Sequence, residues 1–450
     1  MPRHDTWSRS DFSAIFPAGM PARMPGTGPL RRSRQHGGIR KLRANRDLTP
    51  PCRRNTIPPH TTRKFVGKAE NIMIADLTKH RFGLNYTPAR AWWYCWNDFS
   101  ADAIARDLDT IAELGADHIR IMLVWPYFQP NPKAVSEAHL DRLDALMRLA
   151  RDRGIDVCVT LFVGWLSGYS FQPPFQNNKT FYDLAESRVP QELYLARVAE
   201  RMKGHKNFLG IDLGNELNCC WSSDRLETAD TWSRHMLALA EKLLPDAVHV
   251  NGADHNPWFM PATFSPGQLA KSQKVLTLHC WPFFTDALRR GGGDCFHPRS
   301  LRLIESMAAL ARSYAGDPRK PVWVQEFGMS EEWTDPVNIP RFLEDTTLGG
   351  IRAGVNWFTW WSSHDLDRRY EFASLEYSLG LITQDQKIKP AGYAFKEIAE
   401  AYRGREVAIP CAIGIPAPPE VFDMDHTWEW LDHWLDQSGP CLAISSLVSG

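Results

Sequence analysis

The chain has 450 residues, with 52 Lys or Arg and 52 Asp or Glu, so its formal net charge is zero. This length and an apolar content of 43% suffice for one large domain or two medium ones, and exclude a disulfide-stapled miniature. Zero net charge disfavours a general binder of nucleic acid. No apolar run approaches the roughly 20 residues of a membrane span, and no secretory signal is recognisable. We therefore expect no nucleic-acid and no membrane partner.

The zero net charge hides an uneven distribution. Residues 1–72 carry 15 Lys or Arg against 4 Asp or Glu and hold 9 of the 32 prolines. Such a composition, without an amphipathic period, predicts a disordered basic arm. An interaction tail is one interpretation. A non-functional extension is the favoured one, because Met73 lies shortly before the first predicted strand.

The cysteines indicate a reducing compartment. There are nine, an odd number, without a CxxC pair, and several stand inside apolar runs. This pattern favours reduced thiols in a cytoplasmic protein over a disulfide framework or a zinc site. Nothing in the sequence indicates an oligomeric state.

From Arg81 onward, short β-branched or apolar runs alternate with amphipathic stretches, which is typical of a parallel sheet with helices. Eight strands are predicted over 81–86, 118–125, 155–162, 208–214, 247–252, 274–280, 321–327 and 353–360. Seven helices are predicted over 101–116, 137–154, 190–204, 229–244, 299–316, 339–350 and 389–402. This alternation predicts a closed (β/α)8 barrel, an α/β fold, within residues 73–403. A doubly wound open sheet is disfavoured, because TPARAWWYCW replaces the glycine-rich turn expected after its first strand.

Residues 404–450 form a predicted C-terminal extension beyond the barrel. A short Trp-rich helix is expected over 425–436, with Asp425 as its cap. Its apolar face would present Trp428, Leu431, Trp434 and Leu435. Packing of this face on the barrel is favoured over binding of a partner.

Two glutamates stand at strand ends, where barrels of this kind carry their chemistry. Glu216 follows the fourth predicted strand and Glu326 lies near the end of the seventh. Strand alternation places Glu326 on the same side as Val322 and Val324. Each glutamate alone could be an ordinary surface carboxylate. Two that face each other beside aromatic residues indicate catalysis.

Glycoside hydrolysis needs this combination. One carboxyl group must be neutral to protonate the leaving oxygen, while the other must be ionised to attack or to activate water. Sugars also have apolar C–H faces that lie against flat aromatic rings. Trp281, Trp360 and Trp361 stand at strand ends and are candidates for such surfaces, whereas Trp323 and Trp357 are interpreted as packing residues.

The segments that carry these residues resemble glycoside hydrolase family 5, of the clan of retaining (β/α)8 glycosidases. The resemblance rests on LGNE, VQEFG, HCWPFF and TWWSSHD at the fourth, seventh, sixth and eighth strands. FGLNYTP and HIRIMLVWPYFQP, at the first two strands, are similar to the branch that contains bacterial β-mannosidases. The resemblance to the family extends from about Arg81 to Tyr402.

The resemblance implies roles for individual residues. Glu216 would be the general acid/base, and Glu326 the nucleophile of a retaining mechanism with a covalent glycosyl-enzyme. Asn215 would hydrogen-bond the sugar 2-hydroxyl, although strict alternation turns it outward, so a bulge or the strand end must redirect it. Arg120 would keep the nucleophile ionised. The pocket would be lined by His279 and floored by Trp360.

Other positions are less specific. Family members commonly have His-x-Tyr at the sixth strand; here the third position is Trp281, which offers only an indole N–H, so the support of the nucleophile is expected to differ or to come from His279. Candidates for the outer sugar hydroxyls are Trp361, His364 and Asp365, with Gly164 and Trp165 as weaker candidates. The first strand, FGLNY, lacks the HxH of metal-dependent hydrolase barrels, so we expect no metal and no cofactor.

The sequence thus predicts a retaining β-glycosidase that hydrolyses β-mannosidic linkages in small oligosaccharides. An endo-β-mannanase and a β-glucosidase or cellulase-like enzyme of the same family remain alternatives. A non-catalytic carbohydrate-binding barrel is the alternative from another class, and a protein that acts through its basic tail is a third.

Overall fold

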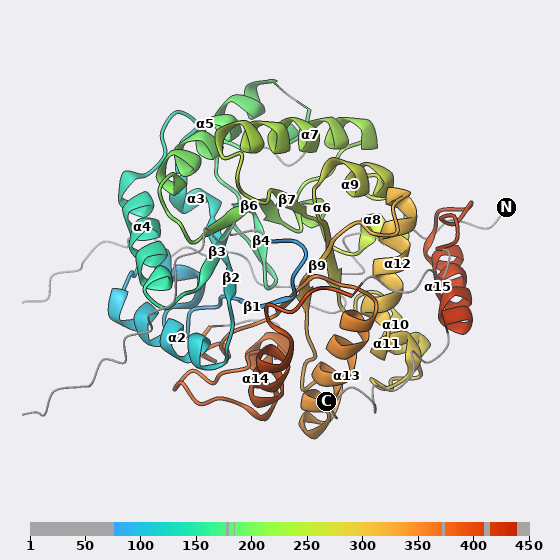
Figure 1. The fold of residues 1–450 in the computed structure, drawn as a ribbon. Helices are drawn as coiled ribbons and strands as arrows, with labels where there is room; N and C mark the ends of the chain where they lie inside the picture. Colours follow the sequence, from blue (N-terminus) through green and yellow to red (C-terminus); the bar gives the residue numbers. More distant parts are fainter. Residues whose placement is uncertain (1–75, 177–179, 184, 371–373, 409–414, 439–450) are drawn as a thin grey trace, which may run out of the picture. The chain divides into compact units, whose positions relative to one another are not determined.

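The computed structural model describes residues 76–176, 180–183, 185–370, 374–408 and 415–438. Eight strands stand at the centre of a ring of helices (Figure 1). They are β1 (Arg81–Asn85), β2 (His118–Val124), β3 (Asp156–Val163), β6 (Phe208–Asn215), β7 (Val250–Gly252), β8 (Leu276–Cys280), β9 (Val322–Phe327) and β10 (Trp357–Trp360). The predicted arm, residues 1–72, lies outside the described residues, and the predicted domain boundaries stay predictions.

All eight strands are parallel, in the order β7-β6-β3-β2-β1-β10-β9-β8. The two edge strands of this order approach each other, since the Thr277 hydroxyl on β8 donates to the carbonyl of Asn251 on β7 over 2.9 Å. The sheet therefore curves into a nearly closed barrel. The eight predicted strands and the (β/α)8 fold class are confirmed.

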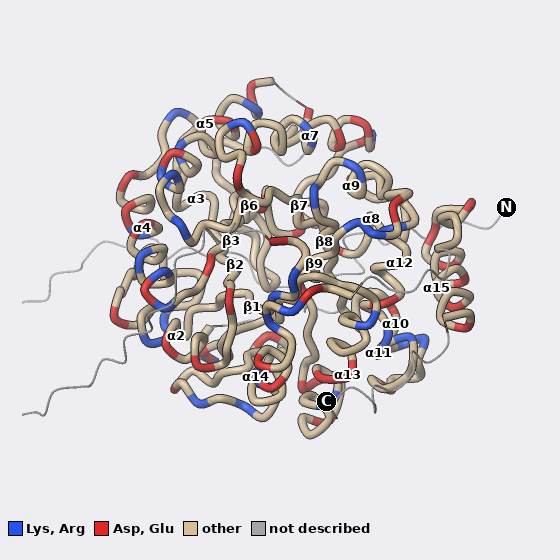
Figure 2. Tube along the Cα trace, viewed as in Figure 1, with Lys and Arg blue, Asp and Glu red and all other residues tan. Residues whose placement is uncertain are grey.

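The helices around the barrel are amphipathic and present their apolar side to the strands. The main ones are α2 (Ala101–Glu113), α4 (Glu137–Arg151), α5 (Ala185–Met202), α7 (Leu226–Leu243), α9 (Pro266–Ser272), α12 (Leu303–Ala315), α13 (Ile339–Arg352) and α14 (Pro390–Tyr402). Lys, Arg, Asp and Glu intermingle along them (Figure 2). In the described ranges, none of the helices combines the length and the apolar character needed to cross a membrane.

Helix α2 illustrates how the sequence sets these boundaries. The Ser100 side chain caps its first turn by accepting a hydrogen bond from the Ala103 N–H. Ile104, Leu108 and Ile111 then follow at helical spacing and are buried. The predicted helix over 299–316 is instead divided into α11 (Pro298–Leu301) and α12.

The barrel interior is layered. Trp323 and Trp357 fill its lower part with ring centroids 5.3 Å apart, which confirms their interpretation as packing residues. Above them the Thr359 hydroxyl accepts from the Trp323 indole over 2.7 Å and contacts the His118 imidazole over 2.8 Å. Polar side chains therefore begin one layer below the strand ends.

Short elements that the sequence analysis did not predict follow the strands. Strands β4 (Trp165–Leu166) and β5 (Tyr169–Ser170) form a hairpin after β3. Its turn residues, Ser167 and Gly168, have φ values of 49° and 85°, as a tight two-residue turn requires. The 3-10 helices η1 (Trp92–Trp96) and η4 (Ser374–Ser378) follow β1 and β10. These elements have no long apolar period from which they could be predicted.

Helix α15 (Met424–Ser438) is the predicted Trp-rich helix, and it packs against α12 and α8 (Asn256–Phe259). The predicted cap Asp425 is wrong by two residues, because Asp423 accepts from the His426 N–H over 2.9 Å. Trp428 is fully buried and its indole donates to the Thr285 carbonyl over 2.9 Å, while the Thr285 hydroxyl donates to the Trp281 carbonyl over 2.7 Å. The helix thus supports the loop after β8.

Replacing Trp428 by Ala should destabilise the protein. The change removes a fully buried indole and its hydrogen bond, so we expect the free energy of unfolding to fall by about 3–5 kcal/mol. Trp434→Ala, on the same helix but only partly buried against Arg302, is the matched control and should cost about 1 kcal/mol or less. Urea unfolding measures both; equal losses would contradict the packing of α15.

Candidate active site

Two carboxyl groups and an imidazole meet at the carboxyl end of the barrel. One oxygen of Glu216, one oxygen of Glu326 and one ring nitrogen of His279 all lie within 4.8 Å of one another. The Glu216 side chain is 18% exposed and that of Glu326 is 4% exposed. Glu216 directly follows β6 with a left-handed φ of 48°, a conformation that is uncommon for non-glycine residues. The two predicted glutamates are therefore brought together.

Glu326 reaches this position through an irregularity in β9. The predicted alternation is wrong for this strand, because Trp323 and Gln325, not Val322 and Val324, point into the barrel. The pairing of β8 with β9 then shifts, so that Leu278 pairs with Val324 but His279 pairs with Glu326. This bulge lets two successive side chains, Gln325 and Glu326, both face inward.

Asn215 is redirected in the same way, as the sequence analysis required. The pairing of β6 with β7 shifts between Asp212 and Asn215. The Asn215 side-chain oxygen accepts from Arg120 over 3.0 Å, and its amide nitrogen donates to the Trp165 carbonyl over 3.4 Å. The amide therefore lies inside the barrel mouth, beside the two glutamates.

Arg120 is buried at the centre of this site. Its guanidinium donates to Glu326 over 2.6 Å, to Asp212 over 2.7 Å, and to the side-chain oxygens of Asn85 and Asn215 over 3.0 Å each. Burial opposes the charge, but the carboxylates of Asp212 and Glu326 outweigh it and raise the pKa of the guanidinium. A fixed positive charge thus lies against the Glu326 carboxyl group at 2.6 Å.

The sequence analysis did not assign Asn85 and Asp212 to the site, although the sequence around each of them contains a feature that could have indicated it. Asn85 is the polar residue that ends β1, within the FGLNYTP segment. Asp212 is an acidic residue inside an apolar strand, which is rare unless it is paired.

His279 lies between the two carboxyl groups. Its Nδ1 contacts Glu216 at 2.9 Å and Glu326 at 3.4 Å, and its Nε2 contacts the Gln325 side chain at 3.3 Å. Burial acts to lower its pKa, but the charge of Glu326 and the hydrogen bond to Glu216 outweigh burial and raise it. The Trp281 indole also donates to Glu326, over 3.4 Å, in the place where family members commonly offer a tyrosine hydroxyl.

The two glutamates have different electrostatic surroundings. Burial and then the negative charge of Glu326 raise the pKa of Glu216 to about 7, although the hydrogen bond from His279 opposes this rise. Glu326 is paired with Arg120 at 2.6 Å. The site can therefore hold one carboxylic acid and one carboxylate near neutral pH, which is what acid-assisted displacement at a glycosidic carbon needs.

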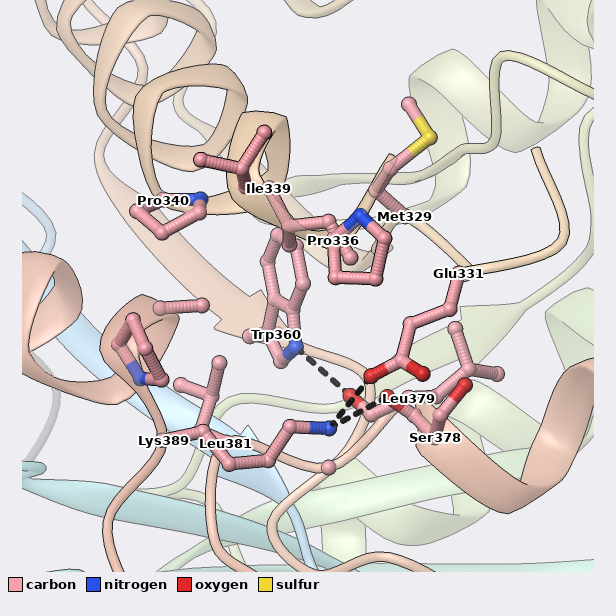
Figure 3. A pocket seen from close by; sticks show the side chains of 14 residues that line it. Met329, Glu331, Pro336, Ile339, Pro340, Trp360, Ser378, Leu379, Leu381 and Lys389 are labelled. Atoms are coloured by element: carbon pink, nitrogen blue, oxygen red, sulfur yellow. Dashed lines mark hydrogen bonds and ion pairs between the residues drawn. The ribbon is translucent and has the colours of Figure 1, made fainter. Parts of the chain in front are cut away.

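Trp360 does not lie over the carboxyl groups. Its ring lines a separate cavity of about 310 Å³, beside α13 and α14, and its indole donates to the Leu379 carbonyl over 3.1 Å (Figure 3). The next residue, Trp361, donates to the Glu376 carboxyl over 3.3 Å and lies 6.2 Å from the Trp93 ring. The structure therefore does not support the expectation that Trp360 forms the sugar floor, and Trp361, the first residue after the strand, is the better candidate.

His364 and Asp365 are engaged elsewhere. His364 is buried and contacts the side chains of Ser363 and Gln386 at 3.1 and 3.2 Å. Asp365 accepts from Lys389 and from the Gly380 N–H, each over 3.0 Å. Both residues hold loops together, so the structure does not support their predicted contact with sugar hydroxyls.

Glu376 is a third carboxyl group near the site, and the sequence analysis missed it. It stands on η4, a segment without any periodic pattern. Burial raises its pKa to about 7; hydrogen bonding to Trp361 and Ser167 opposes the rise, and the charges of Glu326 and Glu216 add to it. Of the weaker candidates, Trp165 contacts the site through its carbonyl, which accepts from Asn215, and Gly164 packs against the Trp221 ring, where a Cβ would come within 2.4 Å.

Glu216, His279 and Glu326 are also the described residues whose spacing could hold a metal ion. Two features disfavour a cation there. The Arg120 guanidinium already donates to Glu326 over 2.6 Å, and the His279 Nδ1 lies against both carboxyl groups, 2.9 Å from Glu216 and 3.4 Å from Glu326. The arrangement suits proton transfer better than metal binding.

Comparison with known proteins gives one family. The chain matches the family model described as cellulase (glycosyl hydrolase family 5) over residues 76–360. A variant GH5_18 from Streptomyces cattleya, solved in complex with Manb1-4GlcNAc, is 30% identical with a TM-score of 0.73, over 80% of this chain and 92% of that one. A GH5_18 from Bifidobacterium longum subsp. infantis is 29% identical with a TM-score of 0.70, over 74% and 81%.

A third solved structure, the exo-beta-1,4-mannosidase Op5Man5 from Opitutaceae bacterium strain TAV5, is 25% identical with a TM-score of 0.65, over 73% of this chain and 62% of that one. No curated protein sequence matches the chain significantly. The family model spans more than half of the chain, and the paired glutamates lie within it. The chain therefore belongs to glycosyl hydrolase family 5 and is a glycoside hydrolase.

Proposed function

We propose that this enzyme is a retaining β-glycosidase that hydrolyses β-mannosidic linkages in small oligosaccharides. The observation that carries the proposal is the approach of Glu216 and Glu326, whose nearest oxygens lie within 4.8 Å. Retaining glycosidases hold their two carboxyl groups about 5–5.5 Å apart, whereas inverting ones leave room for a water molecule.

In this mechanism Glu326 is the nucleophile. Its carboxylate attacks the anomeric carbon as the glycosidic bond breaks, and Glu216 gives its proton to the departing oxygen. In the second step Glu216 takes a proton from water, and that water releases the sugar from Glu326 with net retention. Arg120, His279 and Trp281 hold the nucleophile in place.

Asn215 is the proposed partner of the sugar 2-hydroxyl. Because its oxygen accepts from Arg120, its amide nitrogen faces the mouth and is left with only a long contact of 3.4 Å to the Trp165 carbonyl. That nitrogen is available to donate to a hydroxyl, an interaction that contributes most in the transition state of glycoside cleavage.

The choice of β-mannosides is supported by the comparisons. One similar structure holds Manb1-4GlcNAc and another is described as an exo-beta-1,4-mannosidase. A cytoplasmic location is part of the proposal, because imported oligosaccharides are small and the described cysteines, Cys95, Cys158, Cys219, Cys220, Cys280 and Cys295, are all free thiols. An endo-β-mannanase and a β-glucosidase remain the alternatives within the family. A non-catalytic sugar-binding barrel would not need two opposed carboxyl groups around a buried arginine.

Removing the nucleophile should abolish turnover. For Glu326→Ala we expect kcat/KM on an activated aryl β-mannoside to fall by about 10⁴-fold or more. Azide should restore product formation and give the glycosyl azide of inverted configuration. Glu332→Ala, at an exposed position six residues further on, is the control and should keep full activity. A fully active Glu326→Ala variant would end the proposed mechanism.

The pH dependence of kcat/KM should show the titration of the proposed acid, Glu216. Glu216 must be protonated to assist departure, and its pKa is about 7, so kcat/KM on a substrate with a poor leaving group should fall as the pH rises through 7. A dinitrophenyl glycoside departs without a proton and should lack this alkaline limb. An identical limb for both substrates would assign the titration to another group.

A substrate panel separates the alternatives. We expect hydrolysis of aryl β-mannoside and of mannosyl-N-acetylglucosamine, with aryl β-glucoside and β-galactoside at least about 10-fold poorer in kcat/KM. Release of internal fragments from mannan would identify an endo-mannanase instead. Preference for the β-glucoside would replace the proposed substrate class while leaving the mechanism intact.

A further inference from the structure

A third carboxyl group, Glu376, stands at the mouth of the barrel without a role in the mechanism above. Its Oε2 accepts the indole N–H of Trp361 over 3.3 Å. Trp361 is buried, directly follows β10, and its N–H points along the edge of the ring toward η4. Glu376 therefore lies at the outer edge of the aromatic surface that we assign to the sugar.

Hydrogen bonds to the backbone on both sides of Glu376 fix the segment that carries it. The Trp360 indole donates to the Leu379 carbonyl over 3.1 Å and the Lys389 ammonium donates to the Ser378 carbonyl over 2.8 Å (Figure 3). On the other side of Glu376, the Ser330 hydroxyl donates to the Leu375 carbonyl over 3.2 Å. These bonds fix the backbone around the carboxyl group before any ligand binds, which is the support that a recognition residue needs.

The hairpin after β3 meets η4 at this carboxyl group. The hydroxyl of Ser167, at the hairpin turn, lies close enough to Glu376 to lower its pKa. The indole N–H of Trp93, whose ring neighbours Trp361, is buried without a hydrogen-bond partner among the described residues. Buried polar groups without partners are unusual and call for an explanation; a bound hydroxyl-rich ligand is one.

The position of Glu376 relative to the two catalytic candidates indicates which sugar it meets. Glu216 must face the leaving group, and its other neighbours, His279 on β8 and Asp254 after β7, lie on that side. Glu376 follows β10 and contacts Trp361, whose ring neighbours Trp93 after β1, and the strands β1 and β10 stand across the barrel from β7. The sugar that is transferred to the enzyme, rather than the leaving group, therefore lies against Glu376.

We propose that Glu376 is a substrate-binding residue that accepts hydrogen bonds from hydroxyl groups of the non-reducing terminal sugar, with the Ser167 turn completing the same wall. This inference rests on the proposed glycosidase function and adds to it the group that recognises the sugar ring. A carboxyl oxygen is a strong acceptor for sugar hydroxyls, and the Ser167 turn borders the same position as Glu376. The specificity for one terminal sugar then depends on a loop residue.

Glu376→Gln tests the proposal, because it keeps the side-chain size and an oxygen for the Trp361 indole. We expect kcat/KM to fall by about 10- to 150-fold on the aryl glycoside that the wild-type enzyme hydrolyses best, which corresponds to the loss of one or two strong hydrogen bonds. Glu397→Gln, exposed on α14, is the matched control and should leave kcat/KM unchanged.

Monodeoxy aryl glycosides separate binding from a structural effect. For one or two deoxy positions, the wild-type enzyme should lose as much in kcat/KM as Glu376→Gln does, and the variant should lose little more on the same substrates. Wild-type kinetics for Glu376→Gln would overturn the proposal, and so would a loss that adds fully to that of every deoxy substrate. Either result leaves the activity of the wild-type enzyme, and hence the proposed function, untouched.

Discussion

The site depends on one buried charge, the guanidinium of Arg120. An unpaired charge inside a barrel costs several kcal/mol, so the arginine is tolerated only because carboxylates and amide oxygens satisfy its donors. Asp212 alone would neutralise it. The additional contact holds the Glu326 carboxyl group at 2.6 Å, and the negative charge of Glu326 adds to burial in raising the pKa of Glu216. One ion pair thus connects the buried arginine to both glutamates.

The layered interior explains why this charge can be held in place. Trp323 and Trp357 fill the lower barrel and exclude water, and His118 and Thr359 form a polar layer above them. Arg120 follows His118 by two residues on the same strand, so it enters the next layer upward. Its N–H donors are then already surrounded by acceptors from neighbouring strands, so these side chains need little reorganisation when a substrate binds.

The strands and the paired glutamates could be predicted because both rest on periodic patterns and on the rule that barrel chemistry lies at strand ends. The direction of Glu326 could not be derived correctly, since a bulge in β9 turns both Gln325 and Glu326 inward. Trp360 and Trp361 differ by one position, and the end of β10 decides which ring lies beside Glu376. A pattern with a period of two cannot locate such a one-residue shift.

Glu376 and the Ser167 turn were beyond prediction for a different reason. They lie in loops whose conformation depends on tertiary contacts: Trp360 and Lys389 fix η4, and a turn with two positive φ values fixes the hairpin. Strand residues supply the bond-breaking chemistry that a whole family shares, whereas loop residues border the sugar. The type of reaction can therefore be predicted from motifs at the strand ends, but the specificity for a sugar depends on how the loops fold over those strand ends.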